Sequence, residues 1–410
     1  MTVELSIVMP CLNEAETLAS CIRKAQRYLR RTGVCGEIVI GDNGSTDGSQ
    51  QIAARLGARV VSIPIRGYGA ALYGAITAAR GRYCIMGDSD MSYDFESLDG
   101  FVHKLRQGYD LVMGNRFQGG ILPGAMPWKN HYIGNPILSS IGKFLFHAEA
   151  GDFHCGIRGF SKDAFQRMDL RTTGMEFASE MVIKAKLMGL RTAEVPAVLS
   201  PDGRTRPPHL LPYRDGWRHL RFMLLFSPGW LFLYPGLAMI LLGAVVGGLI
   251  LALPIHLNGV QFGLDTVIYC STLLVAGFQA VLFWLLSRTF TLQAGLYPET
   301  AAEHWYVRFI TLERGLVAGA LLMLSGLGAA VYALWQWKIQ AFGELDLERI
   351  ARIVIPSSVA ISLGMEIILF SFLLSTFGLN VRPYTAMVEE IEHTCSREEA
   401  FADREEALVN

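Results

Sequence analysis

The chain has 410 residues, 51% of them hydrophobic, and a formal net charge of -1 at pH 7. The length allows two or three domains, and the near-neutral charge gives no global electrostatic reason to bind nucleic acid. The apolar excess is uneven: residues 1–210 have the composition of a soluble α/β protein, whereas 230–380 have that of a membrane protein. The seven scattered cysteines show no zinc-binding spacing, which predicts reduced thiols.

The first 90 residues alternate between apolar strands and amphipathic helices. Strands are expected at 5–10, 37–41 and 59–63, with helices at 13–31, 49–56 and 67–79, and a fourth strand from Cys84 carries Asp88 and Asp90 at its end. Such alternation predicts a parallel, doubly wound sheet, in which ligands bind beyond the carboxyl ends of the strands. No basic stretch followed by an apolar core begins the chain, so no cleavable signal peptide is expected and this domain is predicted to stay in the cytoplasm.

Three polar clusters follow the predicted strands, at 10–14, 42–45 and 88–90. In an extended segment residues i and i+2 point to the same side, so Asp88 and Asp90 could present two carboxylates to one cation. Mg²⁺ is commonly held by one or two carboxylates together with substrate phosphates. An isolated pair of this kind is more often two solvated loop acids, but here three clusters meet at one sheet edge. That convergence indicates a binding site.

Seven motifs in a fixed order resemble family 2 glycosyltransferases of the GT-A fold, and in particular the polyprenyl-phosphate sugar synthases typified by dolichyl-phosphate mannose synthase. They occupy residues 9–14, 42–48, 67–71, 88–90, 114–120, 152–160 and 176–181, and Glu194-Val195-Pro196 follows them. The resemblance covers about residues 4–228. It implies an α/β GT-A (Rossmann-like) catalytic domain, and the apolar runs that follow it in the chain predict an all-α membrane domain of four transmembrane helices.

The resemblance also implies a donor site. Pro10, Glu14 and Asp42 would line the nucleoside pocket, and Asp88 and Asp90 would hold Mg²⁺ or Mn²⁺ against the donor diphosphate. The other residues expected to bind the donor are Leu12, Asn13, Gly44, Ser45, Gly69 and Ser89. Leu12 and Asn43 stand where a mannose synthase has tyrosine and a second aspartate, so the donor stays open between the UDP-glucose and GDP-mannose types.

On the acceptor side the resemblance places Arg116 near the lipid phosphate, with Lys129 and His131 adding cationic character. Glu180 would lie near the sugar, and Arg204 would belong to a loop that closes over the donor. Arg206 and His209 are further candidate cations. The predicted catalytic residues are therefore Asp90, Arg116, Glu180 and Arg204.

Four nearly continuous apolar runs occupy about 230–253, 266–287, 315–337 and 353–379. Each is long enough to cross about 30 Å of hydrocarbon. The predicted organisation is a catalytic domain at 1–211, an interfacial amphipathic helix at 212–229, a membrane domain at 230–380 and an acidic tail at 381–410. A second interfacial segment is expected at 298–312. Four spans would return the C-terminus to the cytoplasm.

Polar and small residues in the spans allow further interpretation. Glu366 in the fourth span marks either a functional position or a protonated carboxyl hydrogen-bonded inside the bundle. Two Gly-x-x-x-Gly pairs, Gly243 with Gly247 and Gly315 with Gly319, permit close helix packing. They could act within the bundle or between the subunits of a homo-oligomer.

The predicted reaction is inverting transfer of one hexose from a nucleotide sugar to a polyprenyl phosphate, undecaprenyl or dolichyl, for cell-envelope glycan assembly. Two alternatives remain. A processive polysaccharide synthase also joins a GT-A domain to membrane helices, but its Gln-x-x-Arg-Trp element is absent from this sequence. A non-catalytic protein that transports or scaffolds glycolipids would be favoured by loss of the carboxylate pair or of Arg116, and both are present.

Overall fold

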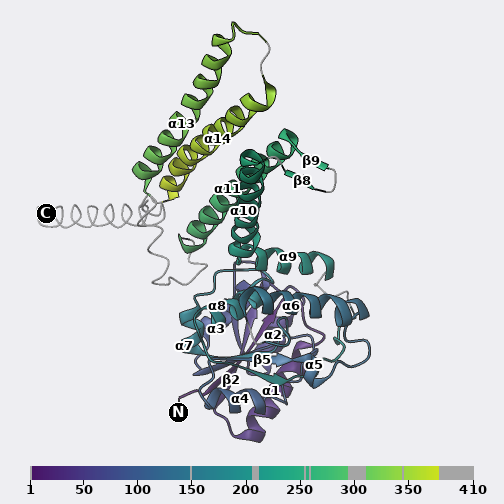
Figure 1. Ribbon diagram of the computed structural model, residues 1–410. Coiled ribbons are helices and arrows are strands. Elements are labelled where there is room, and N and C mark those ends of the chain that lie inside the picture. The colour runs from purple at the N-terminus through teal and green to yellow at the C-terminus, as the bar shows by residue number, and fades with distance from the viewer. Residues whose placement is uncertain are drawn as a thin grey trace, which may run out of the picture. The chain divides into compact units, whose positions relative to one another are not determined.

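The computed structural model describes residues 2–147, 150–205, 212–253, 255–257, 260–293, 311–343 and 346–377 (Figure 1). The chain forms two compact units, Met1–Leu241 with Ala276–Ala302, and Leu242–Val275 with Glu303–Asn410. Four predictions lie outside the described residues: Arg206, His209, nearly all of the segment 298–312 and the tail 381–410. The predicted domain boundaries stay predictions.

A seven-stranded sheet organises the first unit, in the order β3-β2-β1-β4-β6-β5-β7. Its strands are β1 (Leu5–Cys11), β2 (Gly36–Asp42), β3 (Arg59–Ser62), β4 (Tyr83–Met86), β5 (Leu111–Asn115), β6 (Arg158–Ser161) and β7 (Thr192–Pro196). The four strands of the first 90 residues, β1 to β4, are parallel as predicted, and β6, for which the sequence made no prediction, is antiparallel to β4 and β5. The chain reaches β6 from the carboxyl end of β5, where Asp152 contacts Arg116, and therefore runs back through the sheet.

Helices cover both faces of this sheet (Figure 1). They are α1 (Leu18–Thr32), α2 (Ser49–Arg55), α3 (Tyr68–Ala78), α4 (Asp99–Arg106), α5 (Arg116–Gly119), α6 (Asn135–Phe146), α7 (Lys162–Met168), α8 (Phe177–Leu187) and α9 (Pro212–Leu225), with a π-helical turn η1 (Asn130–Gly134) before α6. β1 shows how the two cores form, because Ile7 and Val8 point to opposite faces and join different apolar clusters.

The first helix begins later than the sequence predicts. Asn13 has a φ of 59°, in the left-handed region, and its backbone N–H donates to the Ser45 hydroxyl at 2.9 Å. The N–H of Glu14 donates to the Ser49 hydroxyl at 2.9 Å. Residues 13–14 therefore form a turn that is held against the end of β2, and the helix starts at Leu18.

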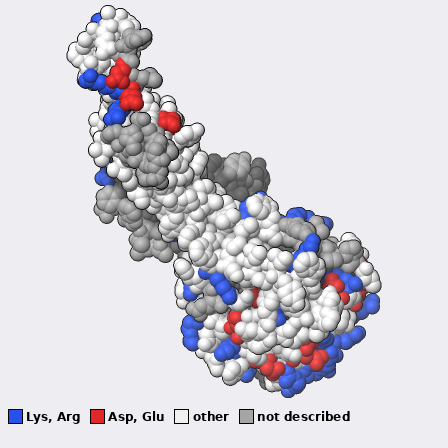
Figure 2. Space-filling view, turned by 45° about the vertical axis from the view of Figure 1, so that its right-hand side comes forward, with Lys and Arg blue, Asp and Glu red and all other residues white. Residues whose placement is uncertain are grey.

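Four helices in the described residues are long and apolar enough to cross a membrane, which confirms the four predicted spans. They are α10 (Tyr234–Ala252) with its preceding π-helical turn η2 (Gly229–Leu233), α11 (Leu264–Gln293), α13 (Leu312–Ile339) and α14 (Leu347–Phe377). A short hairpin, β8 (Ile255–Leu257) and β9 (Val260–Phe262), lies between the first two. Figure 2 shows largely uncharged surface over these helices and many charged side chains over the sheet domain.

Small residues bring α13 and α14 together. A Cβ added at Gly319 would lie 2.8 Å from the Gly364 carbonyl oxygen, and one added at Gly364 would lie 2.7 Å from the Gly319 carbonyl oxygen. The Ser357 hydroxyl donates to the Gly326 carbonyl oxygen at 2.8 Å. Glu366 lies on α14, and its Oε2 is buried without a hydrogen-bond partner among the described residues.

Candidate active site

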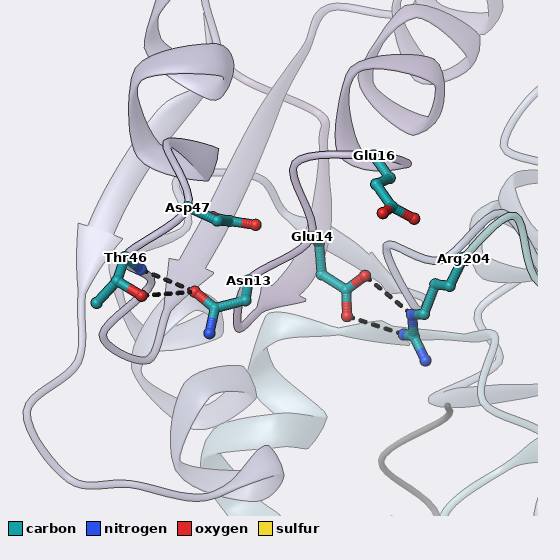
Figure 3. Close-up of a pocket in the computed structure, with 6 residues that line it drawn as sticks. All are labelled: Asn13, Glu14, Glu16, Thr46, Asp47 and Arg204. Atoms are coloured by element: carbon teal, nitrogen blue, oxygen red, sulfur yellow. Dashed lines mark hydrogen bonds and ion pairs between the residues drawn. The ribbon is translucent and has the colours of Figure 1, made fainter. Parts of the chain in front are cut away.

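A cleft of about 410 Å³ opens at the carboxyl ends of β1 and β2 (Figure 3). Its lining residues are Asn13, Glu14, Glu16, Thr46, Asp47 and Arg204. Glu14 follows β1, whereas Arg204 comes from the segment after β7, so the cleft joins parts of the chain almost 200 residues apart. Two of the predicted donor-binding residues and one predicted catalytic residue therefore meet here.

Arg204 connects two carboxylates. Its Nε and Nη2 donate to the two oxygens of Glu14, each at 2.9 Å, and its Nη2 lies 3.2 Å from Asp90 Oδ2. The segment that carries it is fixed on both sides, because Gly203 N–H donates to the Asp90 carbonyl oxygen and Thr205 N–H donates to Glu16. The loop predicted to close over the donor thus lies across the Asp90 turn in this structure.

Asp88 and Asp90 lie at the carboxyl end of β4, as the sequence predicts. The Tyr68 hydroxyl donates to Asp88 Oδ1 at 2.9 Å, and Asp90 Oδ1 accepts from the backbone and hydroxyl of Ser92. Burial, reinforced by the charge of Asp90, raises the pKa of Asp88 to about 7. When Asp88 and Asp90 are both ionised, the positive charge around them therefore does not fully balance their negative charge.

A divalent cation fits this deficit. Carboxylate oxygens are the ligands that Mg²⁺ prefers. Tyr68 uses one oxygen of Asp88 and Ser92 uses one oxygen of Asp90, whereas Oδ2 of Asp90 lies 3.2 Å from Arg204. Among the described residues, no cluster of three His, Cys, Asp or Glu side chains could hold a metal ion. The carboxylate pair accordingly fits a metal that is shared with substrate phosphates better than one enclosed by protein ligands.

The predicted nucleoside-binding loop is tightly hydrogen-bonded. Asp42 is fully buried and accepts from the N–H groups of Gly44 and Ser45 and from Gln50. Asn43 donates its side-chain amide to two carbonyl oxygens, of Ile63 and Ile65, and accepts from Gly67. These side chains fix the backbone after β2 and β3, and contact with a nucleoside stays a prediction.

Three other predicted donor residues have local roles. The Ser89 hydroxyl donates to the Pro10 carbonyl oxygen at 2.7 Å, which ties the Asp88–Asp90 turn to β1. A Cβ at Gly69 would lie 2.7 Å from the Phe177 Cβ, so this glycine allows α3 to pack against α8. Leu12 is half-buried beside the cleft residue Asn13.

Arg116 forms a buried ion pair that the sequence did not indicate. Its Nε and Nη2 donate to the two oxygens of Asp152 at 2.6 and 2.7 Å. Glu194 accepts from Asn115 Nδ2 at 2.9 Å and from the N–H of Asp152 at 3.3 Å, which holds the two partners in place. The predicted acceptor arginine is therefore positioned at the carboxyl end of β5, with its charge already balanced.

Glu180 does not line the cleft. It is fully buried on α8 and accepts from the N–H groups of Arg171 and Thr172 and from Lys184, at 2.8 to 3.1 Å. The turn after Thr172 contacts α3, where the Ala70 N–H donates to the Thr173 carbonyl oxygen. Glu180 thus supports the start of α3, and its contact with a sugar stays a prediction.

The segment before α6 carries Lys129 and His131 and brings His131 close to Phe117, the residue after Arg116. The His131 ring stacks on Tyr132 at 4.3 Å between centroids and lies 6.0 Å from the ring of Phe117, next to Arg116. Lys129 Nζ lies 5.9 Å from the Trp128 ring. The contact of Arg116, Lys129 and His131 with a lipid phosphate stays a prediction.

Sequence reasoning missed Tyr68, Asp152, Glu194 and His154. All four lie within motifs that the sequence singled out, at 67–71, 152–160 and 194–196, but residue type alone did not separate a side chain that contacts substrate from one that holds such a side chain. Their position within these motifs was the sequence signal from which they could have been found. The partners Tyr68–Asp88 and Arg116–Asp152 depend on the fold.

The mixed sheet, the aspartate pair and the apolar helices define a GT-A-type glycosyltransferase attached to the membrane. The family model for glycosyl transferase family 2 matches residues 6–169, and that for the family 2 C-terminal transmembrane region matches 285–378. The chain belongs to glycosyltransferase family 2 and is an integral membrane protein.

Two relatives and one solved structure are similar to this chain. The low-salt glycan biosynthesis hexosyltransferase Agl6 of Haloferax volcanii is 38% identical over 378 residues, covering 91% of this chain and 89% of the relative. A dolichyl-phosphate hexose transferase of the same organism is 30% identical over 194 residues, covering 47% of this chain and 81% of the relative. The solved glucosyl-3-phosphoglycerate synthase of Mycobacterium tuberculosis with Mn²⁺, UDP and product is 22% identical, with a TM-score of 0.42, covering 55% and 80% of the two chains.

Proposed function

We propose that this protein transfers a hexose from a nucleotide sugar, of the UDP-glucose or GDP-mannose type, to a polyprenyl phosphate at the cytoplasmic face of a membrane. Two relatives support this proposal, because one is named a hexosyltransferase and the other a dolichyl-phosphate hexose transferase. The product would be a polyprenyl-phosphate monosaccharide formed with inversion at the anomeric carbon.

The observation that carries the proposal is the contact between the two halves of the site. A Cβ added at Gly156 would lie 2.5 Å from Asp88 Oδ2, so the backbone of Gly156 lies directly against a carboxylate that is predicted to bind the metal. Four residues earlier in the same segment, Asp152 holds Arg116. One short segment thus connects the predicted acceptor arginine with the predicted donor-binding carboxylates.

The donor would occupy the cleft beside Glu14 and Arg204, with its diphosphate toward Asp88 and Asp90. Mg²⁺ or Mn²⁺ bound to these aspartates would act as a Lewis acid and neutralise charge on the leaving diphosphate. Arg204 already lies 3.2 Å from Asp90, and its guanidinium would add positive charge at the same place. Gly203 and Thr205 keep the loop there through their backbone hydrogen bonds.

The acceptor would approach from the side of α6 and α9. Exposed aromatic side chains gather around these helices, with Trp128 63%, Tyr132 71% and Trp217 59% exposed. α9 packs against α6 and α8 and buries Phe222 and Met223 in the core. Aromatic residues of this kind favour the boundary between lipid and water, where a water-soluble donor and a lipid acceptor can meet.

In the reaction, a phosphate oxygen of the acceptor forms a bond to the anomeric carbon as the bond from that carbon to the diphosphate oxygen breaks. The bonding electron pair leaves with the nucleoside diphosphate. A phosphate monoester has a second pKa near 6, so the nucleophile is largely ionised at pH 7 and needs no strong general base. Positioning and electrostatic stabilisation are then the main contributions of the protein.

The test is a transfer assay on the full chain in detergent, with a short polyprenyl phosphate, Mn²⁺ or Mg²⁺, and a panel of radiolabelled UDP- and GDP-sugars. One donor should give a chloroform-soluble, acid-labile product. Asp90→Asn should lower kcat by about 10²–10³-fold, the usual loss when one electrostatic contact to the transition state is removed.

The matched control is Asp94→Asn, because Asp94 lies in the same loop but pairs with Lys24 at 3.1 Å. Its activity should stay within about twofold of the wild type, as expected for a surface pair. Absence of product from every donor with folded wild-type protein would refute the proposed function.

A further inference from the structure

The segment 152–156 is fixed at several points of the site but leaves one side chain without a hydrogen-bond partner among the described residues. Asp152 holds Arg116, and Gly156 lies against Asp88 and donates its N–H to the Tyr93 hydroxyl at 2.9 Å. Along the chain, His154 lies midway between Asp152 and Gly156. It therefore lies between the group expected to bind the acceptor and the group expected to bind the donor.

Both ring nitrogens of His154 are buried and make no hydrogen bond within the described part of the chain. The nearest rings are those of Phe153 and His219, at 5.6 and 4.7 Å between centroids. His219 uses its Nδ1 with the Ser179 hydroxyl at 2.9 Å. Because a buried unsatisfied polar group is costly, such a group calls for a partner that the polypeptide does not supply.

The surroundings of His154 carry unbalanced positive charge. The fully buried Arg158 guanidinium donates to the carbonyl oxygens of Phe153, Cys155 and Ala178, two of which flank His154. These acceptors have no formal charge, and burial lowers the pKa of Arg158. Burial, with His219 and Arg116 nearby, also lowers the pKa of His154, so its imidazole is neutral and keeps one N–H to donate. An anion with acceptor oxygens fits this position.

We propose that His154 binds the acceptor by donating a hydrogen bond from its imidazole to a phosphate oxygen of the polyprenyl phosphate, beside Arg116. This inference rests on the proposed function. His154 as a whole is only partly buried, although both of its ring nitrogens are buried. This role deepens the proposed function, because it adds a residue for which the family resemblance gives no assignment.

The acceptor phosphate is a better fit than the donor diphosphate. The segment of His154 is attached to α6, where the Phe153 N–H donates to the Ser139 hydroxyl at 3.3 Å, and its ring contacts His219 on α9. These two helices carry exposed apolar side chains such as Ile137, Phe144 and Trp217. The donor cleft is lined by other residues, from the ends of β1 and β2 and from the Arg204 segment.

The experiment compares ligand binding to the full chain in detergent by isothermal titration calorimetry. The variants are His154→Leu, which removes the donor, His154→Gln, which keeps an N–H, and His103→Leu, a control on the exposed surface of α4. The probes are farnesyl phosphate, and UDP or GDP with Mn²⁺, whichever the wild type binds.

His154→Leu should raise the Kd for farnesyl phosphate by about 10- to 100-fold, the range for a lost hydrogen bond to a charged group, and leave the nucleotide Kd within about twofold. His154→Gln should recover most of the lost affinity, and His103→Leu should resemble the wild type. The Tm of ligand-free His154→Leu should equal or exceed that of the wild type, because an unsatisfied polar group is replaced by an apolar one. A purely structural histidine would instead lower it.

The outcomes separate this inference from the proposed function. If the wild type binds farnesyl phosphate and His154→Leu binds it equally well, the role of His154 is refuted and the proposed function stands. If His154→Leu loses the nucleotide to the same extent as farnesyl phosphate, the assignment to the acceptor is refuted. If the wild type binds nucleotide but no farnesyl phosphate, the lipid acceptor and the role of His154 are refuted together.

Discussion

The edge of the sheet and the α13–α14 pair are stabilised by different interactions. At the sheet edge, charged side chains hold the structure, as in Arg116 with Asp152 and Arg204 with Glu14. Between α13 and α14, backbone lies against backbone at Gly319 and Gly364. A polar site in water can be built from oriented charges, whereas helices in lipid gain little from apolar burial and depend on close packing.

The difference predicts which changes each region tolerates. A change of charge at nearly constant shape should damage the sheet edge most, because it leaves a buried partner unpaired. Addition of a single methyl group should damage the α13–α14 contact most, because no space exists for it. The following predictions test this contrast.

The largest expected effect is that of Asp152→Asn, which leaves the nearly buried Arg116 without its counter-charge. We expect a loss of about 3–5 kcal/mol in the free energy of unfolding, measured by urea titration of tryptophan fluorescence. The control is Asp99→Asn. The side chains of Arg31 and Asp99 are 56% and 59% exposed, so their ion pair should contribute less than about 1 kcal/mol to the free energy of unfolding. Equal losses in the two variants would contradict the importance of burial here.

A smaller effect is expected between the membrane helices, for Gly319→Ala. The new Cβ would lie 2.8 Å from the Gly364 carbonyl oxygen, and overpacking of this kind costs about 1–3 kcal/mol. Gly328 on the same helix has no atom of the described residues within 4 Å of an added Cβ, so Gly328→Ala should be neutral or slightly stabilising. Unfolding in mixed micelles with increasing SDS measures both, and identical behaviour of the two variants would argue against the glycine contact.

The smallest effect concerns the protonation of Asp88. Its pKa rises from 3.8 to about 7 in the folded protein, so between these values the folded state binds more protons than the unfolded state. Stability of the metal-free protein therefore falls as pH rises through this range. Bound Mn²⁺ would balance the charge of the ionised form, so it should raise Tm more at pH 8 than at pH 5, by about 2–4 °C.

Thermal melts with EDTA or Mn²⁺ at the two pH values measure this effect. Asp88→Asn is the control, because an amide does not titrate and should abolish the difference between the two pH values. If Mn²⁺ raised Tm by the same amount at both pH values, Asp88 would not couple metal binding to pH. The same conclusion would follow if the difference between the two pH values persisted in Asp88→Asn.

Local pattern was sufficient for part of this molecule. The apolar runs of β1, β2 and β4 and the polar residues directly after them placed Glu14, Asp42 and the Asp88–Asp90 pair at one edge, because parallel strands end on the same side. The four spans followed from the length of apolar sequence that a bilayer requires. Both inferences depend on neighbours in the chain, which the sequence contains.

Only the tertiary structure decided how the side chains at that edge are paired. Arg116 and Asp152 are 36 residues apart, and Asp90 and Arg204 come from opposite ends of the domain. Glu180 turned toward Lys184 and the Arg171 turn, and β6 ran against its neighbours. Hydrogen bonding and burial depend on which distant segments the fold brings together. Residue type and spacing therefore indicated the site, whereas packing determined which side chains hold it and left His154 without a hydrogen-bond partner in the part of the chain that the structure describes.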